Sequence, residues 1–98
     1  MSGTELRVAD APLQLRYEGW LGDRLAGFIR YTVDDNVVTL VYTDVDPVFE
    51  GQGVGVGLVE GTLRDLRERG LRAEPVCPFV AAYMRRHPEW DDLRASRR

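Results

Sequence analysis

The first half of the chain alternates apolar and polar side chains with a period of two, which is the period of a β-strand. This alternation predicts strands at Leu13–Gly19, Leu25–Val33 and Val37–Val45. In the first strand, the apolar residues at positions 13, 15 and 17 would share one face. Gly22-Asp23 and the polar residues at 34–36 supply the intervening turns. The third strand is rich in β-branched residues and apolar on both faces, as is typical of a central strand. We expect the three strands to form an antiparallel meander.

Beyond residue 55 the pattern changes to the period of a helix. Apolar side chains recur at 58, 59, 63 and 66 within Val56–Arg69, and Gly70 supplies a stop at the C-terminal end. A fourth strand is predicted at Leu71–Val76. Pro78 suits the first position of a helix, and a short helix is predicted at Phe79–Arg86. A strand–helix–strand unit requires a parallel crossover. The predicted fold class is therefore α+β (mixed α/β), with antiparallel strands followed by a strand-helix-strand-helix unit.

The length and continuity of the pattern predict one domain over residues 1–98, with frayed ends at 1–10 and 95–98. No apolar run approaches the roughly 20 residues that span a bilayer. The N-terminal residues also lack the basic and hydrophobic regions of a signal peptide. We therefore expect a cytoplasmic protein without a membrane partner.

Charge and composition exclude several classes of function. A net charge of −3 argues against a nucleic-acid partner, which requires a basic stripe to displace counterions. The sequence contains no lysine, so all 13 basic residues are arginines, and Schiff-base lysine chemistry is excluded. Cys77 is the sole cysteine, which rules out an internal disulfide and leaves too few soft ligands for a structural zinc site. No metal is expected.

A glycine-rich segment lies between the third strand and the long helix: Glu50-Gly51-Gln52-Gly53-Val54-Gly55-Val56. Glycines allow a ligand to approach the backbone closely and can turn several N–H groups into one concavity. The helix that follows places its positive N-terminal end at the same point. We interpret the segment as an anion site suited to a pyrophosphate. The alternative is a turn in which the glycines serve geometry alone.

The spacing of these glycines narrows the ligand. A dinucleotide fingerprint requires G-x-G-x-x-G, but its last position falls on Val56, Leu58 or Glu60 in the three possible registers. The P-loop pattern fails because it requires a lysine. The remaining pattern resembles the Arg/Gln-x-x-Gly-x-Gly/Ala pyrophosphate loop of the GNAT acetyltransferase superfamily. Two registers fit it: Glu50-x-x-Gly53-x-Gly55, which we prefer because it leaves a better helix, and Gln52-x-x-Gly55-x-Gly57.

Two segments further along make the resemblance more specific. Cys77-Pro78-Phe79-Val80-Ala81-Ala82-Tyr83, followed by Arg86-His87-Pro88-Glu89-Trp90, looks like the signature of a GNAT subfamily of short chains. The resemblance extends from about Arg16 to Leu93. It implies a truncated GNAT fold without the superfamily's first two helices, and acetyl-CoA as cofactor. The acceptor is not implied, because the subfamily is poorly defined in substrate.

The resemblance also implies roles at the end of the third strand. The backbone at Asp44 and Val45 would pair with the pantetheine arm, in the manner of an added strand. Tyr42 stands where the subfamily usually has histidine, and it would contribute to the acceptor pocket. Asp44, on the same strand face as Tyr42, is the candidate general base. The alternative for Asp44 is a solvated carboxylate at a strand end.

Two further residues are candidates for catalysis. Cys77 precedes a helix N-terminus, where the dipole lowers the pKa of a thiol, so it could accept the acetyl group or simply line the thioester pocket. Tyr83 matches the place of a tyrosine that protonates the departing CoA sulfur in many GNAT members. The alternative for Tyr83 is an aromatic core residue on the buried face of its helix.

These observations predict an acetyl-CoA-dependent N-acetyltransferase. Its acceptor would be an amine on a small molecule or a protein, and the protein would be a monomer or a homodimer. The alternative is a module that binds or senses acyl-CoA without catalysis. Glu50 and Tyr42 favour this alternative, because both depart from the family pattern.

Overall fold

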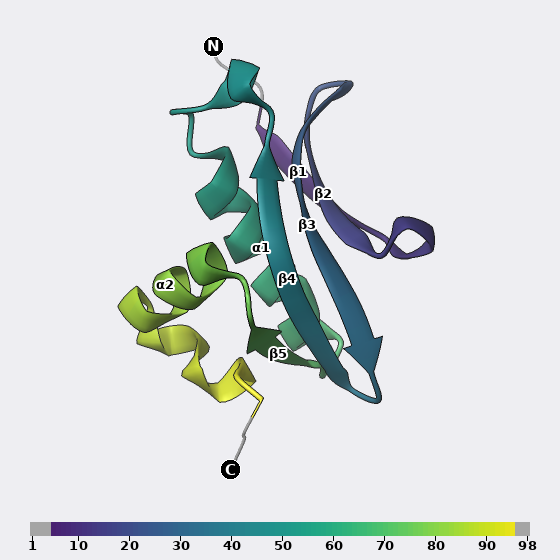
Figure 1. The fold of residues 1–98 in the computed structure, drawn as a ribbon, viewed down its shortest axis with the longest axis vertical. Helices are drawn as coiled ribbons and strands as arrows, with labels where there is room; N and C mark the ends of the chain where they lie inside the picture. Colours follow the sequence, from purple (N-terminus) through teal and green to yellow (C-terminus); the bar gives the residue numbers. More distant parts are fainter. Residues whose placement is uncertain (1–4, 96–98) are drawn as a thin grey trace.

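The computed structural model describes residues 5–95, and its sheet has five strands in the order β1-β2-β3-β4-β5 (Figure 1). Adjacent strands from β1 to β4 pair in antiparallel fashion, and β5 runs parallel to β4. This arrangement confirms the predicted mixed α/β class. The strands are β1 (Leu6–Ala11), β2 (Arg16–Leu21), β3 (Arg24–Asp34), β4 (Val37–Val45) and β5 (Arg72–Pro75).

Both α-helices lie on one side of the sheet, and no helix of residues 5–95 covers its other side, here called the open face (Figure 1). The α1 helix (Val54–Glu68) connects β4 to β5, and α2 (Pro78–Arg86) follows β5. Short 3-10 segments occur at η1 (Pro12–Gln14), η2 (Pro47–Phe49) and η3 (Pro88–Leu93). No helix of residues 5–95 is long and apolar enough to cross a membrane.

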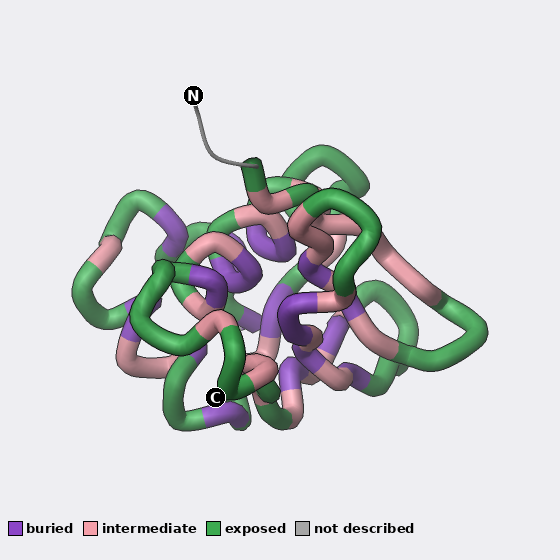
Figure 2. Tube along the Cα trace, turned by 90° about the horizontal axis from the view of Figure 1, so that it is seen from above, coloured by how far each residue is buried: buried purple, intermediate pink, exposed green. Residues whose placement is uncertain are grey.

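The core lies between the sheet and the helices, and Figure 2 shows the buried segments in the middle of the molecule with exposed loops around them. The apolar residues that recur at helical spacing lie on one buried stripe of α1. Leu58, Val59, Leu63 and Leu66 are fully buried. They join Ile29 and Leu40 from the sheet in one apolar cluster. This burial is the main force that holds α1 across the sheet.

A polar network also ties α1 to the sheet. The Tyr17 hydroxyl donates to Asp65 (2.6 Å) and the Tyr31 hydroxyl donates to Asp10 (2.6 Å). Arg69 bridges the two carboxylates, with nitrogen–oxygen distances of 3.0 Å to Asp65 and 3.2 Å to Asp10. Burial, followed by the hydrogen bond to the carboxylate, raises the pKa of both tyrosines well above the ordinary value.

The predicted strand Leu13–Gly19 is wrong at its start. Pro12 begins the 3-10 segment η1, and Leu15 has a left-handed backbone with φ of 55°. The strand therefore begins at Arg16, and Leu13 is 96% exposed rather than aligned with the buried Tyr17.

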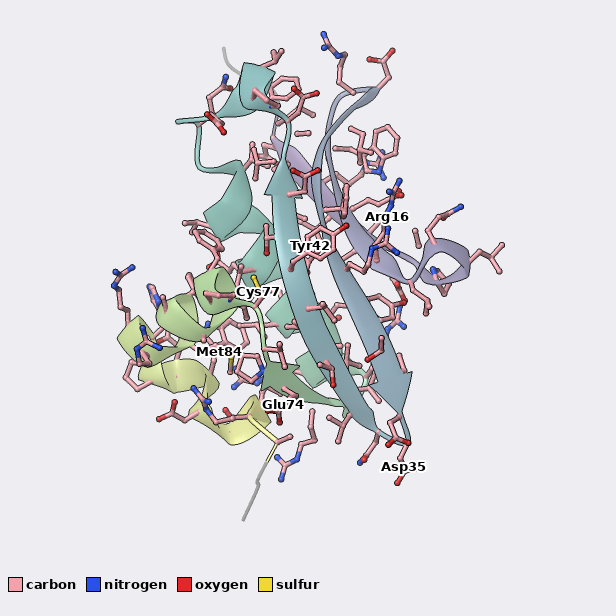
Figure 3. The ribbon with its side chains drawn as sticks, viewed as in Figure 1. Arg16, Asp35, Tyr42, Glu74, Cys77 and Met84 are labelled. Carbon is pink, nitrogen blue, oxygen red and sulfur yellow. The ribbon has the colours of Figure 1, made fainter. Side chains whose placement is uncertain are left out.

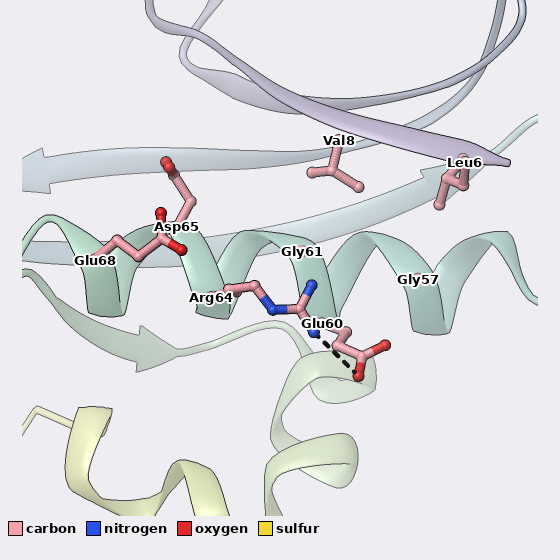
Figure 4. A pocket seen from close by; sticks show the side chains of 8 residues that line it. All are labelled: Leu6, Val8, Gly57, Glu60, Gly61, Arg64, Asp65 and Glu68. Carbon is pink, nitrogen blue, oxygen red and sulfur yellow. Dashed lines mark ion pairs between the residues drawn. The ribbon is translucent and has the colours of Figure 1, made fainter.

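The predicted fraying of residues 1–10 does not hold for Leu6 to Asp10, which belong to β1. Figure 4 shows why this edge strand docks: Leu6 and Val8 face α1 at Gly57 and Gly61. Side chains at these glycines would meet Leu6 at 2.6 Å and Val8 at 2.7 Å. At the other end of the chain, Ala95 is buried and its amide donates to the Ala73 carbonyl (2.8 Å). Residues 1–4 and 96–98 of the predicted frayed ends lie outside the described residues.

Candidate functional site

Among the strands of residues 5–95, the last residues of β4 have a neighbour on one side only. Pairing with β5 ends at Leu40 opposite Pro75, where the Cys77 amide still donates to the Leu40 carbonyl (2.8 Å). Pairing with β3 continues to Val45 opposite Gly27. Beyond Leu40, therefore, β4 and the chain after β5 separate and expose one edge of β4 within the sheet. Such an edge can accept an extended ligand as if it were an added strand.

A cleft of about 500 Å³ lies at this exposed edge, within the size range of small-molecule sites. Four segments contribute to it: the end of β4, the end of η2 with the loop that follows, the first turn of α1, and the first turn of α2. The lining residues are Thr43, Asp44, Val45, Phe49, Glu50, Gly51, Gly53, Val54, Gly55, Val56 and Phe79.

The glycine loop presents the N-terminal end of α1 to this cleft. Asp46 fixes the start of the loop, because its carboxylate accepts from the Val48 amide (3.0 Å). Gly51 and Gly53 have φ of 83° and 78°, a region that favours glycine, and no atom occupies the space that a Cβ atom would take. Gly53 is the N-cap residue and no described side chain caps the helix there. The first-turn N–H groups and the positive end of the helix dipole thus face the cleft, which makes it an anion site.

The position of each glycine distinguishes the two registers considered for the loop. Gly53 and Gly55 line the cleft, whereas Gly57 faces Leu6 of β1. The pattern Glu50-x-x-Gly53-x-Gly55 is therefore the one that faces the cleft, and α1 begins two residues earlier than the predicted Val56.

The positive electrostatic potential of this cleft comes from backbone N–H groups at the start of α1. Among the described residues that line it, Asp44 and Glu50 are charged and none is cationic. Arg24 lies near its edge, with its guanidinium carbon 5.4 Å from the centre of the Phe49 ring. No group of three His, Cys, Asp or Glu residues within 5–95 is arranged to hold a metal ion.

A family model for GCN5-related N-acetyltransferases matches residues 16–93, which is most of the chain. The chain belongs to this family. Membership of this family, abbreviated GNAT, supports acetyltransferase activity.

Solved structures share this fold. A GCN5-like protein from Staphylococcus aureus matches with a TM-score of 0.67 and 24% identity over 100% of this chain and 94% of that one, which shows the shared fold. The ribosomal-protein-S18-alanine N-acetyltransferase of Escherichia coli has a TM-score of 0.54 and 29% identity; the match covers 59% of this chain and 37% of that protein. No match was found among curated proteins.

Most of the predicted CoA-binding residues of this GNAT chain line the cleft: Val45, Glu50, Gly51, Gly53, Val54, Gly55 and Val56. Asp44 does so as well, whereas Gln52 does not. The sequence interpretation missed Thr43, Phe49 and Phe79. Period two along β4 could have indicated Thr43, which shares a strand face with Val45, a residue predicted to bind CoA. Phe79 is brought to the cleft by the packing of α2, which no local pattern reveals.

Cys77 is buried beside the cleft without lining it. It occupies the N-cap of α2, and its Sγ atom lies 3.4 Å from the Thr43 hydroxyl. Figure 3 shows Cys77 on the helix side of β4, whereas Tyr42 points to the open face. The thiol is thus separated from the side chain predicted to contribute to the acceptor pocket.

Tyr83 lies away from the cleft lining, on the buried side of α2. Its ring stacks on that of His87, with centroids 4.0 Å apart, and the Nδ1 atom of His87 lies 2.8 Å from the Tyr83 carbonyl oxygen. Burial raises the pKa of Tyr83, and the Glu60 carboxylate adds to the effect. This placement is that of a packed aromatic residue.

Tyr42 is 43% exposed on the open face. Its ring meets the edge of Phe28, with centroids 6.0 Å apart, and its hydroxyl accepts from Arg30 at 3.4 Å. A β-bulge places Arg30 opposite Tyr42, because the register shifts between Arg30, which pairs with Tyr42, and Tyr31, which pairs with Leu40. Tyr42 therefore shares a surface with the aromatic and arginine side chains of the neighbouring strands.

Proposed function

We propose that this GNAT protein is an acetyl-CoA-dependent N-acetyltransferase that transfers an acetyl group to an amine. One observation carries the proposal: the unpaired edge of β4 and the uncapped N-terminus of α1 meet in a single cleft at the glycine loop. An extended arm that ends in a pyrophosphate fits such a combination of strand edge and anion site. Bound acetyl-CoA would supply an acetyl group activated as a thioester.

The residues that hold the cofactor are then divided by task. The amides of Val54, Gly55 and Val56 bind the pyrophosphate, and the open space at Gly53 lets it approach the backbone. The edge of β4 at Val45 holds the pantetheine arm. Because the cleft lining has no described cation, the helix N-terminus supplies most of the attraction for the phosphates.

Asp44 is the proposed general base. An acceptor ammonium gives one proton to its carboxylate, and the amine nitrogen then forms a bond to the acetyl carbonyl carbon. The carbon–sulfur bond breaks, its electron pair goes to the sulfur, and the second nitrogen proton joins the leaving thiolate. The products are an amide, the free thiol and one proton on Asp44, which passes to water. We assign no step to Cys77 or Tyr83, because neither lines the cleft.

The amine acceptor rests on the family and on the alanine acceptor in the name of the Escherichia coli relative, of which this chain spans 37%. A protein amine and a small amine both remain within the proposal. The cytoplasmic location, and the choice between monomer and homodimer, stay predictions.

A second candidate is a module that binds acyl-CoA without transferring the acyl group. The carboxylate of Glu50 favours it, because this side chain lines the cleft where the family loop has arginine or glutamine. A negative charge there weakens the attraction for a pyrophosphate.

Calorimetric titration with acetyl-CoA, followed by an assay of thiol release with a panel of amines, separates the candidates. Binding with amine-dependent thiol release supports the enzyme, and Asp44→Asn should then lower turnover at least tenfold while CoA binding is spared. Binding without release on any amine supports the sensing module. An absence of binding contradicts both.

A matched pair of glycine variants tests the loop. Gly53→Glu places a carboxylate at the cleft and should abolish measurable CoA binding. Gly70→Glu introduces the same charge and the same backbone strain, since Gly70 has φ of 71°, at the far end of α1. Equal CoA affinities for the two variants would show that the loop does not hold the pyrophosphate.

A further inference from the structure

A second cleft, of about 280 Å³, adjoins the first one at Asp44, a residue that lines both clefts. The second cleft is lined by Leu25, Ala26, Gly27, Phe28, Asp44, Asp46 and Pro47. It is built from β3, the end of β4 and the start of η2. A small molecule in it would therefore lie next to the proposed base without entering the CoA cleft.

Close backbone contacts join β3 to the end of β4 beside this cleft. The pairing of β2 with β3 skips Ala26, since Gly19 pairs with Gly27 and Trp20 with Leu25. The Asp46 amide donates to the Ala26 carbonyl (2.8 Å), which fixes the end of β4 to β3. At Gly27 a Cβ atom would lie only 2.6 Å from the Asp44 carbonyl oxygen.

Phe28 forms an apolar wall of this cleft and is held in place by its neighbours. The guanidinium carbon of Arg16 lies 4.6 Å from the centre of the ring, and that of Arg30 lies 5.8 Å from it. Tyr42 contacts the ring at an edge-to-face angle of 66°. Arg16 is itself paired with Glu18 at 2.8 Å. These contacts restrict the rotamers of Phe28 and make the wall preformed.

The ionisable residues that line the cleft have one sign, whereas the two guanidinium groups over the Phe28 ring are not among its lining residues. Among the described lining residues, Asp44 and Asp46 are the ionisable ones. Asp46 is oriented by the bond that its Oδ1 atom accepts from the Val48 amide. Two carboxylates beside the apolar side chains of Leu25, Phe28 and Pro47 suit a cation on an apolar stem.

We propose that this second cleft is the acceptor site and that it selects a primary amine on a short apolar stem. The inference rests on the proposed function, because the acceptor matters only if the first cleft holds acetyl-CoA. The stem packs on Phe28 and Pro47, and the ammonium lies between Asp46 and Asp44. Asp46 is then a positioning residue, and Asp44 both binds the ammonium and takes its proton.

Binding can be measured without turnover by using CoA, which has no acetyl group to transfer, together with n-butylamine. Calorimetry first establishes that CoA binds; failure at this step contradicts the proposed function itself. Backbone amide NMR of the CoA-saturated protein then follows a titration with n-butylamine. We expect saturable shifts at 25–28 and 44–47, and none there with butyrate, which has a stem of similar length and the opposite charge. If CoA binds but butylamine causes no such shifts, or butyrate causes equal ones, the acceptor inference alone is overturned.

Two variants sharpen the test. Asp46→Asn keeps an oxygen for the Val48 amide but removes the charge, and should weaken butylamine binding about five- to tenfold. Asp35→Asn makes the same change at the β3–β4 turn and should leave the affinity unchanged. Phe28→Leu keeps an apolar filling and should weaken butylamine less than Phe28→Ala, while CoA affinity stays constant in both. Equal butylamine affinity in the wild type and in Asp46→Asn would contradict the proposal.

Discussion

The ring of Phe79 lies directly against Gly55: a Cβ atom at position 55 would be 3.0 Å from the Cζ atom of that ring. Gly55 belongs to the first turn of α1 and Phe79 to the first turn of α2, and both line the proposed CoA cleft. The absence of a side chain at position 55 therefore lets α2 close one side of the cleft. The glycine has a packing role in addition to the backbone access that the loop requires.

This contact predicts the effect of Gly55→Ala. The added methyl group must displace the Phe79 ring by a few tenths of an ångström, so CoA affinity should fall severalfold. Global stability should change little, because alanine is favoured in a helix. In a Phe79→Ala background the same substitution should cost no further affinity. Calorimetry on the four proteins of this double-mutant cycle measures the coupling. Equal losses in both backgrounds would contradict a role for the ring.

The glycine loop could be predicted from the sequence because its signal is local. Gly51 and Gly53 adopt the positive φ that glycine permits, and the helical period begins just after them. The docking of β1 could not be predicted in this way. Leu6 and Val8 are stabilised by Gly57 and Gly61, about fifty residues further along the chain, and an isolated apolar pair gives no period.

The catalytic candidates show a similar limit. Period two correctly placed Asp44 at the exposed end of β4, but the sequence could not show that this residue separates two clefts. For Cys77 and Tyr83 the sequence left burial and catalysis as alternatives. Their positions depend on how α2 packs on β4 and α1, which is set by contacts distant in sequence.

The β1–α1 contact predicts different outcomes for two helix glycines. In Gly57→Ala the new methyl group meets the end of the flexible Leu6 side chain, which can move aside. In Gly61→Ala it meets the Cβ of Val8 at 2.8 Å, and a β-branched residue has little freedom to yield. Alanine gains about 1 kcal/mol of helix propensity at both sites. Gly57→Ala should therefore be neutral or stabilising. For Gly61→Ala, overpacking should cost about 2–3 kcal/mol, so the free energy of unfolding should fall by about 1–2 kcal/mol net. Urea unfolding of both variants checks the difference, and an equal response would contradict this packing.

Direct transfer predicts that Cys77→Ala retains activity. The substitution removes a buried thiol and its contact with the Thr43 hydroxyl, so about 1 kcal/mol of stability should be lost. Turnover with amines should stay within about threefold of wild type, since no step passes through the thiol. Mass spectrometry after incubation with acetyl-CoA should find no acetyl group on Cys77. A trapped acetyl-cysteine together with a large loss of turnover in Cys77→Ala would establish the covalent route instead.

The tyrosine–carboxylate network predicts a loss of stability at alkaline pH. Burial and the bonds to Asp65 and Asp10 raise the pKa of Tyr17 and Tyr31 in the folded state, whereas a tyrosine in the unfolded chain has a pKa of about 10. The folded state thus holds these protons more tightly. Its extra stability is fully present below pH 10 and decreases as the pH rises above that value, because only the unfolded chain then releases them.

Urea unfolding between pH 7 and 11 measures this dependence. In the double variant Tyr17→Phe/Tyr31→Phe, the free energy of unfolding at pH 7 should fall by about 2 kcal/mol, because two buried hydrogen bonds are lost. Its decline above pH 10 should be shallower than that of the wild type. Tyr42→Phe is the control, since this exposed hydroxyl has no carboxylate partner among the described bonds. The same steep decline in wild type and double variant would show that the protons of Tyr17 and Tyr31 do not stabilise the fold.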